Sequence, residues 1–287
     1  MTRSELVRLI GLTAQVILLH FGMEPLLQQI QSSELFRQTW HQEDRCEKLS
    51  DEALPKLGKK ASKLIPSMER VLSYLDAISS CAFGCEQGDH ALERLLFRCC
   101  NRARAAVRLS RLGYYDESLM ITRALGEAAN LMLLFTIDAS VVDAWRRQEK
   151  WARSAVEIRK ALEVANHIAA VDQSRYSILS GLAAHADPNY APSAFNVLAQ
   201  PVSPGSFSEE GLLVTFNEIS FPLGLLVFPA TSLFTIPQTA RVATLKAGAE
   251  LIRNVGGFMI DKQTEYWDRK RSDLIAAIES EGKTSIS

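Results

Sequence analysis

The chain has 287 residues, of which 47% are hydrophobic, and a formal net charge of −1 at pH 7. This length suits one large domain or two small ones, and the hydrophobic content is typical of a globular protein with a proper core. The nearly neutral charge argues against a protein whose main task is nucleic-acid binding, although local basic patches remain open.

Helical periodicity runs through almost the whole sequence, and no alternating strand pattern with hairpin turns stands out. The sequence therefore predicts an all-α fold. We expect helices at about 3–21, 24–45, 50–81, 88–113, 115–138, 140–171, 173–186, 209–236 and 238–280.

The breaks between these helices suggest three regions. Several prolines exclude a continuous helix over residues 187–208, and a break of this length inside a domain is often a lid, a binding loop or a linker. The expected regions are an N-terminal helical region at 1–85, a central helical bundle at 86–186, and C-terminal helices at 209–280 that pack on the bundle.

Two apolar segments share some features with membrane or targeting elements. Leu9–Leu19 follows two arginines, as in a signal peptide, but no small-residue cleavage site comes after it. Leu212–Ile236 is long enough to span a bilayer, but it contains Asn217, Glu218 and two prolines and lacks strongly basic flanks. Both are predicted to be core helices. The five cysteines form no dense framework, so reduced thiols and a cytoplasmic location are expected.

The segment Tyr115–Asp138 is the most informative part of the sequence. At 100° per residue its apolar side chains cover most of the circumference, which is typical of a helix in the middle of a bundle. Arg123, Glu127 and Asn130 nevertheless share one narrow stripe of it. We therefore predict a multi-helix bundle with a central buried helix at about 115–138. Its polar stripe could bind a small anion or stabilise a charged transition state, or it could be a structural network that fixes helix register.

The preceding helix carries a row of arginines on one half of its wheel and apolar residues on the other half. These arginines are Arg94, Arg98, Arg102, Arg104, Arg108 and Arg111. This face, with Arg98 and Arg102 as candidate binding residues, could contact phosphates, an acidic protein partner or a second copy of the chain. It could equally be a solvated face, or one whose arginines pair with acids on neighbouring helices.

His185 is expected on the inward face near the end of a helix, where it would either transfer protons or complement the helix dipole. Cys81 and Cys85 have helical spacing and not the spacing of a zinc knuckle, so no metal ion or cofactor is predicted. No Gly-rich phosphate loop and no G-x-S-x-G motif are present in the sequence.

Two patterns together resemble a family of bacterial helical proteins known only as a domain of unknown function. The first is the run from Leu95 to Phe135 with R-A-L-x-E-A around Arg123, and the second is Tyr176-x3-Ser180-x4-His185. The resemblance implies an all-helical bundle and no established activity. It also implies that five side chains converge, namely Arg123, Glu127, Tyr176, Ser180 and His185.

A more distant similarity is to the HEPN class of helical ribonucleases and nucleotide-binding proteins. The signature of that class is an arginine followed by four to six residues and then a histidine. Ser180, Leu179 and Ile178 hold the three positions that would carry the arginine before His185, so the chain departs from the signature. A catalytic role would require Arg123 to supply the missing cation.

These features favour a bacterial bundle protein that binds a protein partner, a second copy of itself or a small ligand. A role in stress or phage defence is implied by the resemblance alone. The alternative is a HEPN-like, metal-independent ribonuclease or nucleotide-binding enzyme. In that case Arg123 would stabilise phosphate charge, Glu127 would orient Arg123, and His185 would transfer protons. Asn130, Tyr176 and Ser180 are the further candidate binding residues.

Overall fold

The computed structural model describes residues 35–58, 61–84, 89–181, 206–255 and 275–276. The chain divides into two compact units, residues 1–42 and 43–287. The described residues form helices and no strand, which confirms the all-α prediction. The helix expected at 3–21 and most of the break expected at 187–208 lie outside the described residues.

The α-helices are α3 (Leu35–Ala53), α4 (Ala61–Ser79), α5 (Ala91–Arg111), α6 (Tyr115–Ile137), α7 (Ser140–Arg146), α8 (Ala155–Val164), α9 (Gln173–Leu179), α10 (Glu209–Leu225), α11 (Val227–Leu233) and α12 (Gln238–Asn254). Two short 3-10 helices, η1 (Leu54–Lys56) and η2 (Trp151–Arg153), join some of them. The regions expected at 86–186 and 209–280 both lie in the second unit.

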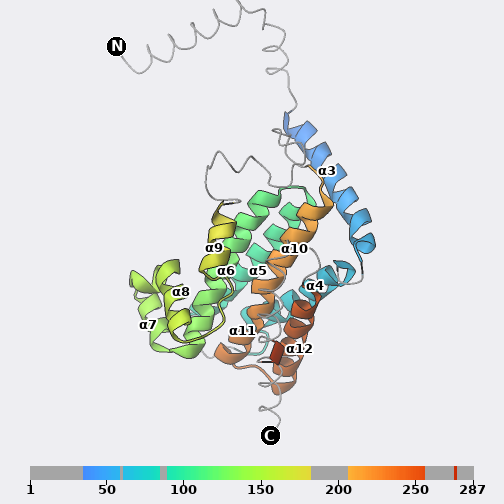
Figure 1. The fold of residues 1–287 in the computed structure, drawn as a ribbon. Coiled ribbons are helices and arrows are strands. Elements are labelled where there is room, and N and C mark those ends of the chain that lie inside the picture. The colour runs from blue at the N-terminus through green and yellow to red at the C-terminus, as the bar shows by residue number, and fades with distance from the viewer. Residues whose placement is uncertain (1–34, 59–60, 85–88, 182–205, 256–274, 277–287) are drawn as a thin grey trace, which may run out of the picture. The chain divides into compact units, whose positions relative to one another are not determined.

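Helix α6 lies at the centre of the second unit. It packs against α5 and α10 along much of its length and also contacts α7, α8, α9 and α11. Most of its apolar side chains are buried, and those of Leu125 and Met132 are fully buried. Figure 1 shows α7, α8 and α9 on one flank of the α5–α6–α10 group, and α4 and α12 on the other. The predicted central buried helix is therefore confirmed.

Several predicted helix ends have clear physical causes. Gly113 ends α5 with a φ of 85°, a conformation that glycine adopts without steric cost. Asp172 precedes α9, and its carboxylate accepts a hydrogen bond from the main-chain N–H of Arg175 at 2.8 Å. Asp89 accepts a similar bond from the N–H of Ala91 at 3.0 Å, although His90 is the N-cap residue of α5.

The prediction of a single helix at 140–171 is wrong, because the structure has three shorter helices there, α7, η2 and α8. Gln148 and Asn166 both have positive φ values, 60° and 51°, and a residue in this left-handed conformation ends a right-handed helix. The helix expected at 50–81 is also divided. Pro55 lies within η1, between the end of α3 and the start of α4.

Helix α12 packs closely against α10 and α11 at Gly248. A Cβ atom added to Gly248 of α12 would lie 2.4 Å from the Val227 side chain and 3.1 Å from the carbonyl oxygen of Gly224. Both distances are tighter than ordinary packing, so this position requires a residue without a side chain.

We expect the substitution Gly248→Ala to lower the free energy of unfolding by about 1–3 kcal/mol, the usual effect of overpacking a core. Thermal or urea unfolding measures the change. Lys246→Ala, at an exposed position of the same helix, is the matched control and should change stability by less than about 0.5 kcal/mol. A Gly248→Ala variant as stable as the control would contradict this close packing.

Two helices, Tyr115–Ile137 and Glu209–Leu233, are long and apolar enough to cross a membrane by length and composition. Each helix contains an 18-residue apolar stretch, and 61% and 89% of that stretch, respectively, is buried inside the structure. Core helices pass the same test, so this finding is weak evidence for a membrane span.

Candidate functional site

Two arginines from different helices converge on the ring of Tyr176. Arg123 of α6 donates a hydrogen bond from Nη2 to the Tyr176 hydroxyl at 2.5 Å, and its Cζ lies 4.1 Å from the ring centroid. The Cζ of Arg159, on α8, lies 3.9 Å from the same centroid. Both distances are within the range of cation–π attraction. Tyr176 is therefore the centre of a cationic cluster, defined here as Arg123, Glu127, Arg159, Gln173 and Tyr176.

Arg159 is the most unusual member of the cationic cluster. It is only 6% exposed, and its Nη2 donates one hydrogen bond, to Gln173 Oε1 at 3.2 Å. Its Nε and Nη1 atoms are buried and have no hydrogen-bond partner in the described part of the chain. Burying a charged group without a counter-charge is costly, so a guanidinium in this state is suited to an acceptor that arrives from outside.

Arg123 and Glu127 form the ion pair that their spacing predicts, with 3.1 Å between Nε and Oε1. Their side chains are 22% and 29% exposed. The pair is therefore half-buried, whereas the sequence predicted a buried pair. A pair with this access to water contributes only about 0–1 kcal/mol to stability. Its clearer effect is to orient the Arg123 guanidinium toward Tyr176.

Contacts with α6 hold the main chain of residues 170–171, which leads into α9, the helix that carries Tyr176. Asn130 donates from Nδ2 to the carbonyl oxygen of Val171 at 2.7 Å, and its Oδ1 accepts from the N–H of Ala170 at 2.6 Å. Gly126 lies one turn earlier, and its missing Cβ makes room for Val171. These contacts fix the segment that leads into α9. Asn130 is a predicted binding residue, but in the structure its side-chain amide forms hydrogen bonds with main-chain groups.

A buried ion pair holds α9 to α10. Arg175 donates from Nε to Glu218 Oε2 at 2.6 Å and pairs with the second carboxylate oxygen through Nη2. The two residues are only 6% and 3% exposed. Burial lowers the pKa of the Arg175 guanidinium to about 10, and Asp172 opposes this shift. The arginine therefore stays charged at neutral pH, and the pair fixes the helix that carries Tyr176.

The structure places the other predicted site residues as follows. Ser180 is buried, and its hydroxyl donates to the carbonyl oxygen of Tyr176 at 2.6 Å, within its own helical turn. His185 lies outside the described residues. The structure thus joins Arg123, Glu127 and Tyr176 of the five residues expected to converge, and the catalytic geometry that needs His185 stays a prediction.

Half of the arginine-rich face of α5 pairs with acids of neighbouring helices. Arg104 pairs with Asp76 of α4, and Arg108 and Arg111 pair with Glu47 of α3. These contacts match the structural interpretation of that face. Of the two candidate binding residues, Arg98 is exposed, whereas Arg102 donates to the carbonyl oxygen of Ala124 at 3.0 Å.

A hollow of about 840 Å³ lies along this paired face. Its lining residues are Asp51, Ile65, Met68, Glu69, Leu72, Ser73, Asp76, Arg104, Val107, Arg108 and Arg111. The acids offset the arginines in this hollow, so its charge favours neither anions nor cations strongly.

No protein-family model matches the chain, and comparisons with curated proteins and with solved structures give no match either. The resemblances to the helical family of unknown function and to the HEPN class therefore remain predictions.

Sequence reasoning missed Arg159 and Gln173. A signal for Arg159 exists, because Ile158, Arg159 and Leu162 lie on one face of α8 at helical spacing and all three are buried. The presence of an arginine on an otherwise apolar helix face therefore indicated that Arg159 could be a buried, functional residue. Nothing in the sequence pattern indicated that it would meet Tyr176.

Proposed function

We propose that the protein binds a small oxyanion, carried by a phosphate or carboxylate group, at the cationic cluster around Tyr176. The observation that carries the proposal is Arg159, whose guanidinium is nearly covered and has two donors without an acceptor in the described part of the chain. Phosphate and carboxylate oxygens match the planar donor geometry of a guanidinium and can bind two of its N–H groups at once.

The charge balance of the cationic cluster supports an anionic ligand. Two guanidinium groups, Arg123 and Arg159, face one carboxylate, Glu127, which leaves one net positive charge. The side chains of Arg123, Glu127 and Tyr176 are partly exposed, so solvent reaches this part of the cluster. A partly dry environment strengthens the attraction between the guanidinium groups and an anion.

The experiment is thermal unfolding of the purified chain titrated with inorganic phosphate, a nucleoside monophosphate and citrate at constant ionic strength. A ligand that binds only the folded chain raises its stability by about 2.7 kcal/mol at 100 times its dissociation constant. We expect at least one of these probes to raise the melting temperature. Sodium chloride at the same ionic strength should not reproduce the effect.

We expect Arg159→Met to remove the stabilisation by the ligand while leaving the unliganded chain as stable as the original or more stable. The reason is that methionine fills a similar space and carries no donors that need an acceptor. Lys160→Met is the matched control, because Lys160 is the neighbouring cation and is exposed. This control should keep the full response to the ligand.

Two results would contradict the proposal. In the first, no probe raises the melting temperature and Arg159→Met lowers stability by more than about 2 kcal/mol, the size of a lost structural interaction. In the second, binding is lost in Arg108→Met and retained in Arg159→Met, which would move the site to the hollow beside α5.

A further inference from the structure

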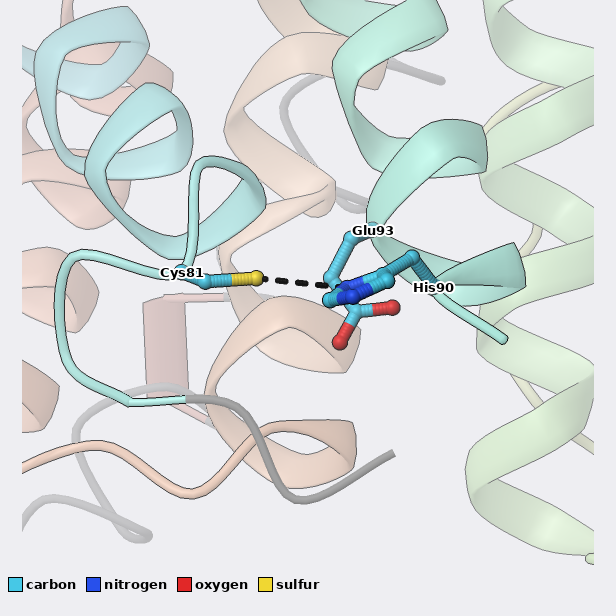
Figure 2. A group of neighbouring side chains, drawn as sticks. All are labelled: Cys81, His90 and Glu93. Atoms are coloured by element: carbon cyan, nitrogen blue, oxygen red, sulfur yellow. Dashed lines mark hydrogen bonds between the residues drawn. The ribbon is translucent and has the colours of Figure 1, made fainter. Parts of the chain in front are cut away.

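Three side chains of different chemistry meet where α4 is joined to α5. Cys81 lies in the turn after α4, His90 is the N-cap residue of α5, and Glu93 lies in the first turn of α5. One ligand atom from each lies within 4.8 Å of the others, and Cys81 Sγ lies 3.6 Å from His90 Nδ1. Figure 2 shows the thiol pointing at the imidazole, with the carboxylate beside the ring.

These separations fit the edges of a tetrahedral metal site. Zinc binds thiolate sulfur at about 2.3 Å and imidazole nitrogen at about 2.0–2.1 Å, so a tetrahedral angle between them separates S from N by about 3.6 Å. The observed Cys81–His90 distance has this value. The remaining edges can shorten from at most 4.8 Å by small rotations of the Glu93 side chain.

The residues that carry the thiol and the imidazole both have an unusual backbone conformation. Cys81 and His90 both have left-handed φ values, 59° and 48°, which are uncommon for residues with a side chain. Each such residue costs about 1–2 kcal/mol, so other interactions must hold it in place. A metal ion bound to both side chains would supply such an interaction.

We propose that Cys81, His90 and Glu93 bind a zinc ion. A mixed set of sulfur, nitrogen and oxygen ligands suits zinc, whereas magnesium and calcium prefer oxygen ligands alone. Partial burial of Cys81 and His90 and nearly full burial of Glu93 would shield the ion from most solvent. The proposal departs from the sequence-based prediction of no metal, which rested on the helical spacing of Cys81 and Cys85.

The test is metal binding by the full chain after treatment with a chelator, using Zn²⁺ in competition with a chromophoric chelator and Co²⁺ as a spectroscopic probe. We expect one ion per chain, and a thiolate-to-metal charge-transfer band in the Co²⁺ complex. Loss of outer-shell partners typically weakens metal binding by about 10–100-fold, so loss of a ligand should weaken it at least about tenfold.

The variants Cys81→Ala, His90→Gln and Glu93→Gln should each weaken binding, and Cys81→Ala should also remove the charge-transfer band. Cys99→Ala is the matched control. Cys99 is fully buried, and its burial raises the pKa of the thiol to about 12, so it is a poor ligand. Circular dichroism of the metal-free proteins checks that each variant folds.

Either of two outcomes would overturn the proposal: less than one bound ion per chain, or equal affinity in Cys81→Ala and the unsubstituted chain. Both would show that Cys81 and His90 make an ordinary thiol–imidazole hydrogen bond. The result is independent of oxyanion binding at Tyr176, because the two sites share no residue.

Discussion

Replacing Glu218 with glutamine should lower the free energy of unfolding by about 3–5 kcal/mol, the usual consequence of removing one partner of a buried ion pair. Arg175 and Glu218 are both nearly inaccessible, so water cannot take the place of the lost charge. Asp172 also favours the charged form of Arg175, and we therefore expect the lower end of this range. Urea unfolding monitored by circular dichroism measures the difference.

Glu210→Gln is the matched control for this substitution, since Glu210 is exposed in the first turn of the same helix. Its effect should stay below about 1 kcal/mol, the usual limit for a charge near a helix end. The double variant Arg175→Met/Glu218→Leu should recover most of the stability, because it removes both buried charges together. A loss below about 1 kcal/mol for Glu218→Gln would mean that water reaches the pair.

Replacing Asn130 with alanine should have the second largest effect, a loss of about 3 kcal/mol, because each buried polar group left without a partner costs about 1–3 kcal/mol. The substitution removes the acceptor for the Ala170 N–H and the donor for the Val171 carbonyl. It should also weaken ligand stabilisation, because the segment 170–171 leads into the helix that carries Tyr176. Thermal unfolding with and without phosphate measures both effects.

Asn101→Ala is the control for Asn130→Ala, since Asn101 is an exposed asparagine on the neighbouring helix α5. Its effect should stay within about 0.5 kcal/mol, as for most surface substitutions. If Asn130→Ala kept full stability but lost the response to phosphate, the amide would be a ligand-binding group, as the sequence alone suggested, and not a main-chain clamp.

The proposed functions rest on groups whose environments differ sharply from those of chemically similar residues elsewhere in the chain. Arg159 is buried and Lys160, the next residue, is exposed. Likewise, Cys81 is partly exposed, whereas burial raises the pKa of the Cys99 thiol to about 12. These contrasts supply the matched variants that separate a ligand-binding role from a general effect on folding.

The sequence alone predicts the all-α class, the central helix α6, the C-terminal end of α5, the start of α9 and the Arg123–Glu127 pair. All of these follow from interactions within a few residues of the chain, such as helical periodicity, capping and i,i+4 spacing. The helix breaks within 140–171 also have a local cause, the left-handed conformation of Gln148 and Asn166. Glutamine and asparagine also adopt other conformations, so their presence in the sequence does not predict these breaks.

Which polar groups meet across helices depends on how the helices pack against one another. Arg159 and Tyr176 lie on different helices, as do Arg175 and Glu218, and the helical pattern specifies the face of each residue without specifying what packs against it. Burial was decided in the same way. Arg123 is partly exposed and Arg159 is buried because different segments cover α6 and α8, and these segments are placed by packing between helices distant in the sequence.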